Sequence, residues 1–266
     1  MISRKSNHRR APEHGQIAEN GPGLYNGTLY LARRELRRTW RSYIWAIMIA
    51  PIMGVAAAFL LASDPGQGAD SEYQLYPAML NGVFVLLIAF LPRASNWHSG
   101  GSGSTGWSLP SNEHLAFLRS LPLTIGQITA ARAAVSVISA LVLCALFFAP
   151  FYALSGALRE ELGAAGCLFF AAFWIGVSLA FEAVGIVTEL GFSGTVGFLV
   201  YMLTLCVSIG AATSMAGQRA SAVGGIVELT QDFGALPALV ALSVGWGALA
   251  VSWLATSERL RKKESR

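Results

Sequence analysis

The chain alternates between long apolar runs and short polar segments. Six apolar runs cover about residues 44–62, 75–92, 127–154, 165–187, 195–213 and 235–255. About 20 helical residues cross the roughly 30 Å hydrocarbon layer of a bilayer, so each run is long enough, the second being short and the third long. The pattern predicts an all-α membrane protein in which residues 44–257 form six transmembrane helices.

Residues 24–43 show a second kind of periodicity. Apolar and aromatic side chains recur every three or four residues and define one helix face; they are Tyr25, Leu29, Ala32, Leu36, Trp40 and Tyr43. Basic side chains occupy the rest of the surface: Arg33, Arg34, Arg37, Arg38 and Arg41. Such a helix lies naturally among lipid headgroups. We expect an interfacial amphipathic helix before the first span, and a solvated basic helix of a soluble domain is the alternative.

The two ends of the chain are polar. Residues 1–23 hold few apolar groups, which is typical of a disordered tail, and they lack the apolar centre of a cleavable signal peptide. Residues 258–266 form a basic tail expected to lie on anionic headgroups.

Composition and charge agree with a membrane location. The chain is 54% hydrophobic and only 13% charged, whereas soluble domains carry about 25% charge. If both termini are cytoplasmic, all of the 19 Lys and Arg except Arg159 and Arg219 belong to the inner side. The positive-inside rule therefore predicts cytoplasmic termini, an inner loop at 93–126 and an outer loop at 214–234. The net charge of +4 then faces anionic lipid, and no nucleic-acid partner is expected.

The inner loop ends in signals for a short helix, a break and a new helix. One face of the short helix, which starts near Glu113, carries Leu115, Phe117, Leu118 and Leu121. Pro122 ends it, because the residue before a proline is pushed out of the helical region. Thr124 then caps the third span, and Gln127 completes a capping box. Such an element can transmit a displacement from a soluble partner protein to the transmembrane helices.

At this point residues 24–257 resemble the permease subunits of ABC-2 type (type V) ABC exporters. The interfacial helix, the six spans with both ends inside and the phrase L-R-S-L-P-L-T-I-G-Q-I (Leu118–Ile128) carry the resemblance. In that family the phrase belongs to the coupling region that touches the ATP-binding subunit. The resemblance therefore implies coupling roles for Glu113, Leu115, Phe117, Leu118, Arg119, Leu121, Pro122 and Thr124, and Glu189 in a short inner loop is a candidate second contact.

Two features depart from the family pattern. Ala116 stands where the family often has an acidic residue, and Ile125 and Gly126 replace basic residues that often follow the proline. The apolar part of the docking contact is intact, whereas its ionic part differs.

The resemblance also implies the partners. Two permease subunits, identical or homologous, would enclose a pathway in a prokaryotic plasma membrane. Two separate ABC ATPase subunits would bind ATP-Mg, so this chain itself would bind no cofactor. A largely apolar pathway suits a hydrophobic or amphipathic cargo. The alternative is a self-contained secondary carrier or a membrane scaffold; a carrier needs matching ion-coupling carboxylates or broken helices in two halves.

Signals for catalysis are weak. The P-loop-like stretch Gly101–Ser108 has Trp107 in place of the lysine that reaches the phosphates. Glu160 and Glu161 suggest an intramembrane CAAX-type protease, but Ala165 replaces its arginine. The four histidines lie outside the spans (His8, His14, His98 and His114), so they predict no intramembrane metal site. The sequence predicts that the chain is not an enzyme.

Few polar groups fall inside the spans. Glu182 is a candidate for the translocation pathway, because a carboxylate at membrane depth is costly; the alternative is a side chain that reaches the inner interface or bonds to a neighbouring helix. Asn81 is the second candidate, although an interhelical hydrogen bond is the favoured interpretation. In the outer loop, 222–229 predicts a short external or re-entrant helix. The glycine pairs Gly194/Gly197 and Gly245/Gly247 predict close helix packing.

Overall fold

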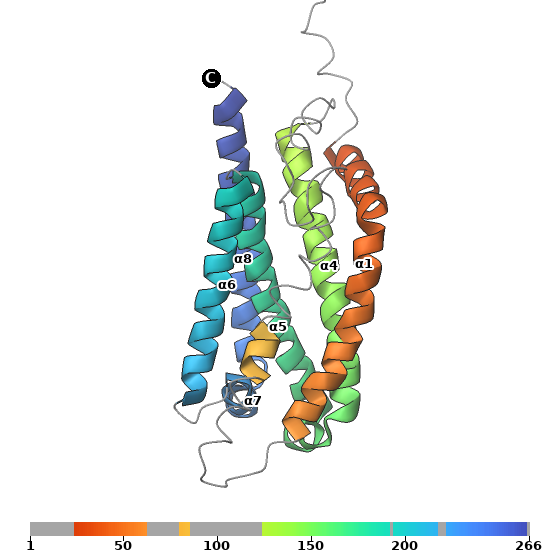
Figure 1. Cartoon of the computed structure of the whole chain (residues 1–266), viewed down its shortest axis with the longest axis vertical. Helices are drawn as coiled ribbons and strands as arrows, with labels where there is room; N and C mark the ends of the chain where they lie inside the picture. Colours follow the sequence, from red (N-terminus) through yellow and green to blue (C-terminus); the bar gives the residue numbers. More distant parts are fainter. Residues whose placement is uncertain (1–23, 63–79, 86–123, 192–193, 218–221, 265–266) are drawn as a thin grey trace, which may run out of the picture.

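The computed structural model describes residues 24–62, 80–85, 124–191, 194–217 and 222–264, and no strand occurs among them. The helices are α1 (Leu24–Ala62), α4 (Ile125–Leu154), α5 (Gly156–Gly191), α6 (Gly194–Gly217), α7 (Ala222–Phe233) and α8 (Leu236–Glu264), with a further short helix at 80–85 (Figure 1). The predicted all-helical fold class is confirmed.

Four helices in the described part are long and apolar enough to cross a membrane. Their spans are Tyr43–Leu61, Gly126–Leu154, Leu158–Thr188 and Leu236–Arg259, which match the first, third, fourth and sixth predicted runs. The fifth run is helical in α6, but its apolar part is the shorter stretch Leu199–Ala211. Most of the second run lies outside the described residues. The chain is thus a multi-pass membrane protein, and a count of six spans stays a prediction.

The long helices are aligned along one axis (Figure 1). α1 and α4 run in the same direction, because Leu31 packs on Ile128 near their starts, whereas Gly54 meets Phe147 towards their ends. α5 runs opposite to α4. The starts of α1 and α4 and the last residue of α8 lie together at what we call the Thr124 end, and α7 lies at the other, the α7 end (Figure 1).

The predicted interfacial segment 24–43 is helical, but it continues into the first span as one helix of 39 residues. It is therefore not a separate element. Leu31 and Ala32 are buried against α4, whereas Leu29 and Trp40 of the predicted apolar face are 57% and 53% exposed, and the prediction that this face lies among lipid headgroups stays a prediction. The packed face is set by contact with Ile128 and its neighbours, which periodicity alone does not reveal.

The arginines of this segment agree with the predicted basic surface where they are described. Arg33, Arg34 and Arg37 are exposed. The side chains of Arg38 and Arg41 lie outside the described residues.

The core at the α7 end is a cluster of aromatic rings. Phe84, on the helix at 80–85, is fully buried, and its ring centroid lies 5.2 to 6.3 Å from five others. Those rings belong to α4 and α5: Phe147, Phe148, Phe151, Phe170 and Trp174. Edge-to-face and tilted arrangements dominate, as expected for favourable ring contacts.

Glycines bring two helix pairs into backbone contact. A Cβ added at Gly245 of α8 would lie 2.4 Å from the carbonyl oxygen of Gly176 on α5, and one added at Gly54 of α1 would lie 2.2 Å from that of Phe147 on α4. The predicted packing role of Gly245 is confirmed. Gly247 differs, because an added Cβ there meets no described atom within 4 Å.

Candidate functional site

The start of α4 has the geometry that the sequence predicts. Thr124 is extended (φ −72°, ψ 152°) and its side chain accepts a hydrogen bond from the Gln127 N–H at 3.3 Å. The Thr124 N–H donates to Gln127 Oε1 at 2.8 Å. These reciprocal bonds form a capping box, which fixes the residue at which the helix begins. Thr124 is exposed, so the cap lies at the surface of the Thr124 end.

The other predicted coupling residues lie outside the described part, except for Glu189. These are Glu113, Leu115, Phe117, Leu118, Arg119, Leu121 and Pro122. Glu189 belongs to the last turn of α5, although its side chain is not described. Because α5 runs opposite to α4, its last turn lies at the Thr124 end together with the capping box (Figure 1). The described part of the predicted coupling set is thus gathered at one end.

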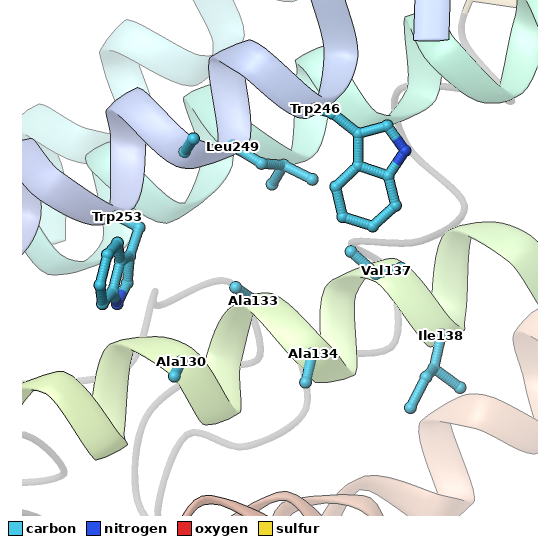
Figure 2. A pocket seen from close by; sticks show the side chains of 9 residues that line it. Ala130, Ala133, Ala134, Val137, Ile138, Trp246, Leu249 and Trp253 are labelled. Atoms are coloured by element: carbon cyan, nitrogen blue, oxygen red, sulfur yellow. The ribbon is translucent and has the colours of Figure 1, made fainter. Parts of the chain in front are cut away.

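An apolar groove separates the first half of α4 from α8. Its volume is about 490 Å³, and Figure 2 shows the indole rings of Trp246 and Trp253 on the α8 side of it. The α4 side of the groove is lined in part by small alanine side chains. The lining consists of Ala130, Ala133, Ala134, Val137, Ile138, Trp246, Leu249, Ala250 and Trp253. We call this the α4–α8 groove.

A second apolar groove lies on the other side of α4, against α1. Its volume is about 370 Å³, and Ile138 lines both grooves. Its lining consists of Leu36, Trp40, Tyr43, Ile44, Ile47, Ile138, Ser139, Val142 and Leu143. The Tyr43 hydroxyl bonds to Ser139 Oγ, and Ser139 Oγ also donates to the carbonyl of Val135 at 2.7 Å. This polar contact fastens α1 to α4 beside the groove.

Glu182 lies inside the helix bundle. It is 1% exposed on α5, and its neighbours Leu179 and Ala183 pack with Ala140 of α4 and Leu249 of α8. The alternative of a side chain that reaches the inner interface therefore does not describe this conformation. Neither groove has Glu182 in its lining.

Asn81 forms the type of interhelical contact that the sequence favours. It is fully buried, and its Oδ1 accepts a hydrogen bond of 3.2 Å from the N–H of Val223. Val223 is the second residue of α7, so the predicted short helix of the outer loop is present, extended to Phe233. Asn81 thus connects two elements that are 142 residues apart in sequence.

α7 is amphipathic. Its buried side chains follow helical spacing: Val223, Ile226, Val227 and Thr230. The opposite side exposes Glu228, Leu229, Asp232 and Phe233. Gly234 follows the last residue of α7; its φ is +59° and its N–H donates to the carbonyl of Thr230 at 3.0 Å. A glycine that takes the left-handed conformation is a common way to end a helix.

Two features of these sites were not found from the sequence. The aromatic cluster had a partial signal, since Phe147, Phe148 and Phe151 share one side of a helix, but the partner rings are set by helix register. The paired tryptophans Trp246 and Trp253 are seven residues apart, which places them on one face of α8.

The described residues contain no cluster of three or more His, Cys, Asp or Glu side chains suited to a metal ion. Comparisons with family models, with curated proteins and with solved structures give no match to this chain.

Proposed function

We propose that this chain is the membrane-spanning permease subunit of an ATP-driven exporter of the ABC-2 type in a prokaryotic plasma membrane. In this proposal, separate ATPase subunits dock at the Thr124 end, which faces the cytoplasm, and a second permease subunit completes the pathway. The cargo is hydrophobic or amphipathic. The capping box at Thr124 is the observation that carries the proposal, because it starts a new helix directly after the predicted coupling segment.

α4 is a suitable element to transmit a displacement. Its 30 residues extend roughly 45 Å, from the Thr124 end to the aromatic cluster. The capping box makes the first turn of α4 continuous with the rest of the helix. A displacement of the residues before Thr124 is therefore expected to move α4 as a rigid unit. Closure of the ATPase subunits would in this way bias the spans between inward-facing and outward-facing packings.

The α4–α8 groove provides space for that movement. A packed interface resists displacement, because interiors are close-packed and shift between discrete arrangements. Over its first half α4 instead faces a groove of about 490 Å³ on the α8 side. The start of α4 can therefore approach Trp246 and Trp253 by closing this groove.

The charge of the Thr124 end supports its cytoplasmic orientation. Arg33, Arg34 and Arg37 of α1 are exposed, as is Arg259 near the end of α8. These arginines belong to the two helix segments that reach the Thr124 end (Figure 1). Exposed basic side chains beside a membrane span are favoured on the cytoplasmic side and interact with anionic headgroups.

Co-purification with an ATPase tests the proposal. The full chain is purified in mild detergent from membranes of its native host, and ATP hydrolysis in the eluate is measured. We expect Leu118→Glu to reduce the co-purified ATPase activity about tenfold or more, because a charge placed in an apolar contact costs at least about 1.4 kcal/mol.

Leu229→Glu is the matched control. Leu229 is 45% exposed on α7 at the opposite end, so this variant should retain the ATPase. Equal ATPase recovery from both variants would show that Leu118 has no coupling role. If wild-type chain that is inserted in the membrane brings no ATPase with it, the secondary carrier or scaffold becomes the better description.

A further inference from the structure

The groove between α1 and α4 crosses the level at which the first membrane span begins. Its volume is about 370 Å³, within the range of roughly 300–1,000 Å³ that is usual for small-molecule sites. The span of α1 begins at Tyr43, which lines the groove. Leu36 and Trp40 line it before that residue, and Ile44 and Ile47 line it after. This cavity, which we call the α1–α4 groove, therefore extends from the interfacial layer into the hydrocarbon.

The lining of the α1–α4 groove suits a hydrocarbon chain. α4 contributes the apolar side chains of Ile138 and Val142, and the hydroxyl groups of Tyr43 and Ser139 are bonded to each other. Ile138 and Val142 are 47% and 44% exposed, so the groove opens to the outer surface of the helix bundle. In a membrane that surface meets lipid acyl chains. An acyl chain can therefore enter the groove from the side.

Two arginines lie on the groove face of α1, at the interfacial end of the groove. Arg33 is three residues before Leu36 and seven before Trp40, and Arg37 is three before Trp40 and seven before Ile44. Helix residues three, four or seven apart share one face. Both arginine side chains are exposed. The groove thus combines an apolar floor with two cationic groups at one end.

The two helices that form the groove carry little negative charge. The 30 residues of α4 include no Asp or Glu. Glu35 is the one acidic residue in the sequence of α1, and it lies two positions from Arg33 and from Arg37. Residues two apart on a helix do not face each other. The interfacial end of the groove is therefore suited to an anion.

We propose that the α1–α4 groove binds one anionic phospholipid, with an acyl chain against Trp40, Ile44 and Ile47 and the phosphate at Arg33 and Arg37. Guanidinium groups bind phosphate oxygens through two parallel hydrogen bonds, and the apolar lining binds the chain. A soluble phosphate would use only the arginines, and a neutral hydrocarbon only the groove. Placement of this lipid in the cytoplasmic leaflet rests on the proposed function, which directs the Thr124 end inward.

Lipid titration of the purified full chain tests this site. The chain is kept in mild detergent, dioleoyl phosphatidylglycerol is added, and native mass spectrometry counts the lipids bound to each chain. One phosphatidylglycerol should bind in a saturable step, about tenfold or more tighter than dioleoyl phosphatidylcholine, since each arginine near an anionic group contributes about fivefold in affinity. The two lipids have the same acyl chains, so equal affinities overturn the proposal.

Single arginine substitutions test the headgroup contact. Arg33→Gln and Arg37→Gln should each weaken phosphatidylglycerol binding about fivefold and leave phosphatidylcholine binding unchanged. Arg34→Gln is the matched control, because it removes the same charge from an exposed position next to Arg33 that is off the groove face. Its affinity should stay close to the wild-type value. Equal losses in Arg33→Gln and Arg34→Gln would mean general attraction to a basic helix and would overturn the site.

Two tryptophan substitutions test the acyl-chain contact. Val142→Trp fills the groove and should abolish the saturable phosphatidylglycerol step. Leu141→Trp is the matched control, because the neighbouring Leu141 is outside the groove lining. Both positions are 44% exposed, so both variants should fold and melt close to the wild-type temperature. Equal lipid binding by the two variants overturns the proposal. Displacement of the lipid by an excess of inorganic phosphate also overturns it, because the arginines would then bind a soluble anion.

This titration is independent of the exporter assignment, because it requires neither an ATPase nor a membrane orientation. If phosphatidylglycerol binds as expected but no ATPase co-purifies with the chain, the lipid site stands and the exporter assignment fails. If an ATPase co-purifies but the two lipids bind equally, the exporter assignment stands and the lipid site fails.

Discussion

α4 faces the α4–α8 groove over its first half and contacts a cluster of rings and a glycine over its second half. Ile138 of the first half lines this groove, whereas Phe147 of the second half contacts Phe84 and the backbone at Gly54. The two halves belong to one continuous helix with the same apolar character. The difference therefore comes from the neighbours of each half and not from α4 itself.

This contrast indicates which half can move. The second half is held by ring packing and a backbone contact that must break together. It has a groove of its own on the α5 side, of about 370 Å³, which is lined by Phe148 and Phe151. The first half has space on the α8 side. A displacement applied at Thr124 is expected to tilt α4 as a unit, with a large shift in the first half and a smaller one at the rings.

The largest effect is expected from removal of the central ring. Phe84→Ala should lower the free energy of unfolding by about 3 to 5 kcal/mol, because it leaves a cavity among five rings. Unfolding by denaturing detergent, followed by tryptophan fluorescence, measures it. Phe59→Ala is the control, since Phe59 is 64% exposed on α1 and should change stability by less than about 0.5 kcal/mol. Equal losses of unfolding free energy in Phe84→Ala and Phe59→Ala would contradict the view that the rings around Phe84 hold the second half of α4.

Smaller effects on stability, opposite in sign to each other, are expected from substitutions at two glycines. Gly54→Ala should destabilise by about 1 to 3 kcal/mol, because its Cβ would meet the Phe147 carbonyl oxygen at 2.2 Å. Gly247→Ala should instead stabilise by up to about 1 kcal/mol, because helix propensity improves where no described atom lies within 4 Å. The same unfolding measurement compares the pair. A gain in stability for both Gly54→Ala and Gly247→Ala would show that α1 and α4 separate readily.

The smallest effect is expected in the first half of α4. Ala134→Leu adds volume that the α4–α8 groove can hold, so stability should change by less than about 0.5 kcal/mol. Ala140→Leu, six residues further on and fully buried, should cost about 1 to 3 kcal/mol. Thermal melting of the two variants in the same detergent tests this, and equal melting temperatures would mean that the groove closes in solution.

Local signals in the sequence were enough to predict several elements. The capping box of Thr124 and Gln127 depends only on residues three apart, so the start of α4 was predicted correctly. The short apolar stretch 222–229 likewise predicted α7. Four of the apolar runs match described spans because length and hydropathy determine them.

Features that depend on contacts between helices were predicted less well. The close approach at Gly54 and Gly176 and the rings around Phe84 require the register of two helices, which a single periodicity does not contain. The periodicity of 24–43 likewise did not show that Leu31 packs on α4 while Leu29 and Trp40 are exposed. In a membrane, apolar side chains also face lipid, so apolar periodicity does not separate a packed face from an exposed one.

The two glycine contacts reduce the number of parts that can move separately. α5 and α8 run in parallel and touch at Gly176 and Gly245, and α1 and α4 run in parallel and touch at Gly54. Each pair is then expected to move as one rigid unit, and the α4–α8 groove lies between the two units. The distance between fluorophores at the start of α1 and the end of α8 would therefore report how far the two helix pairs separate, because each fluorophore belongs to a different pair.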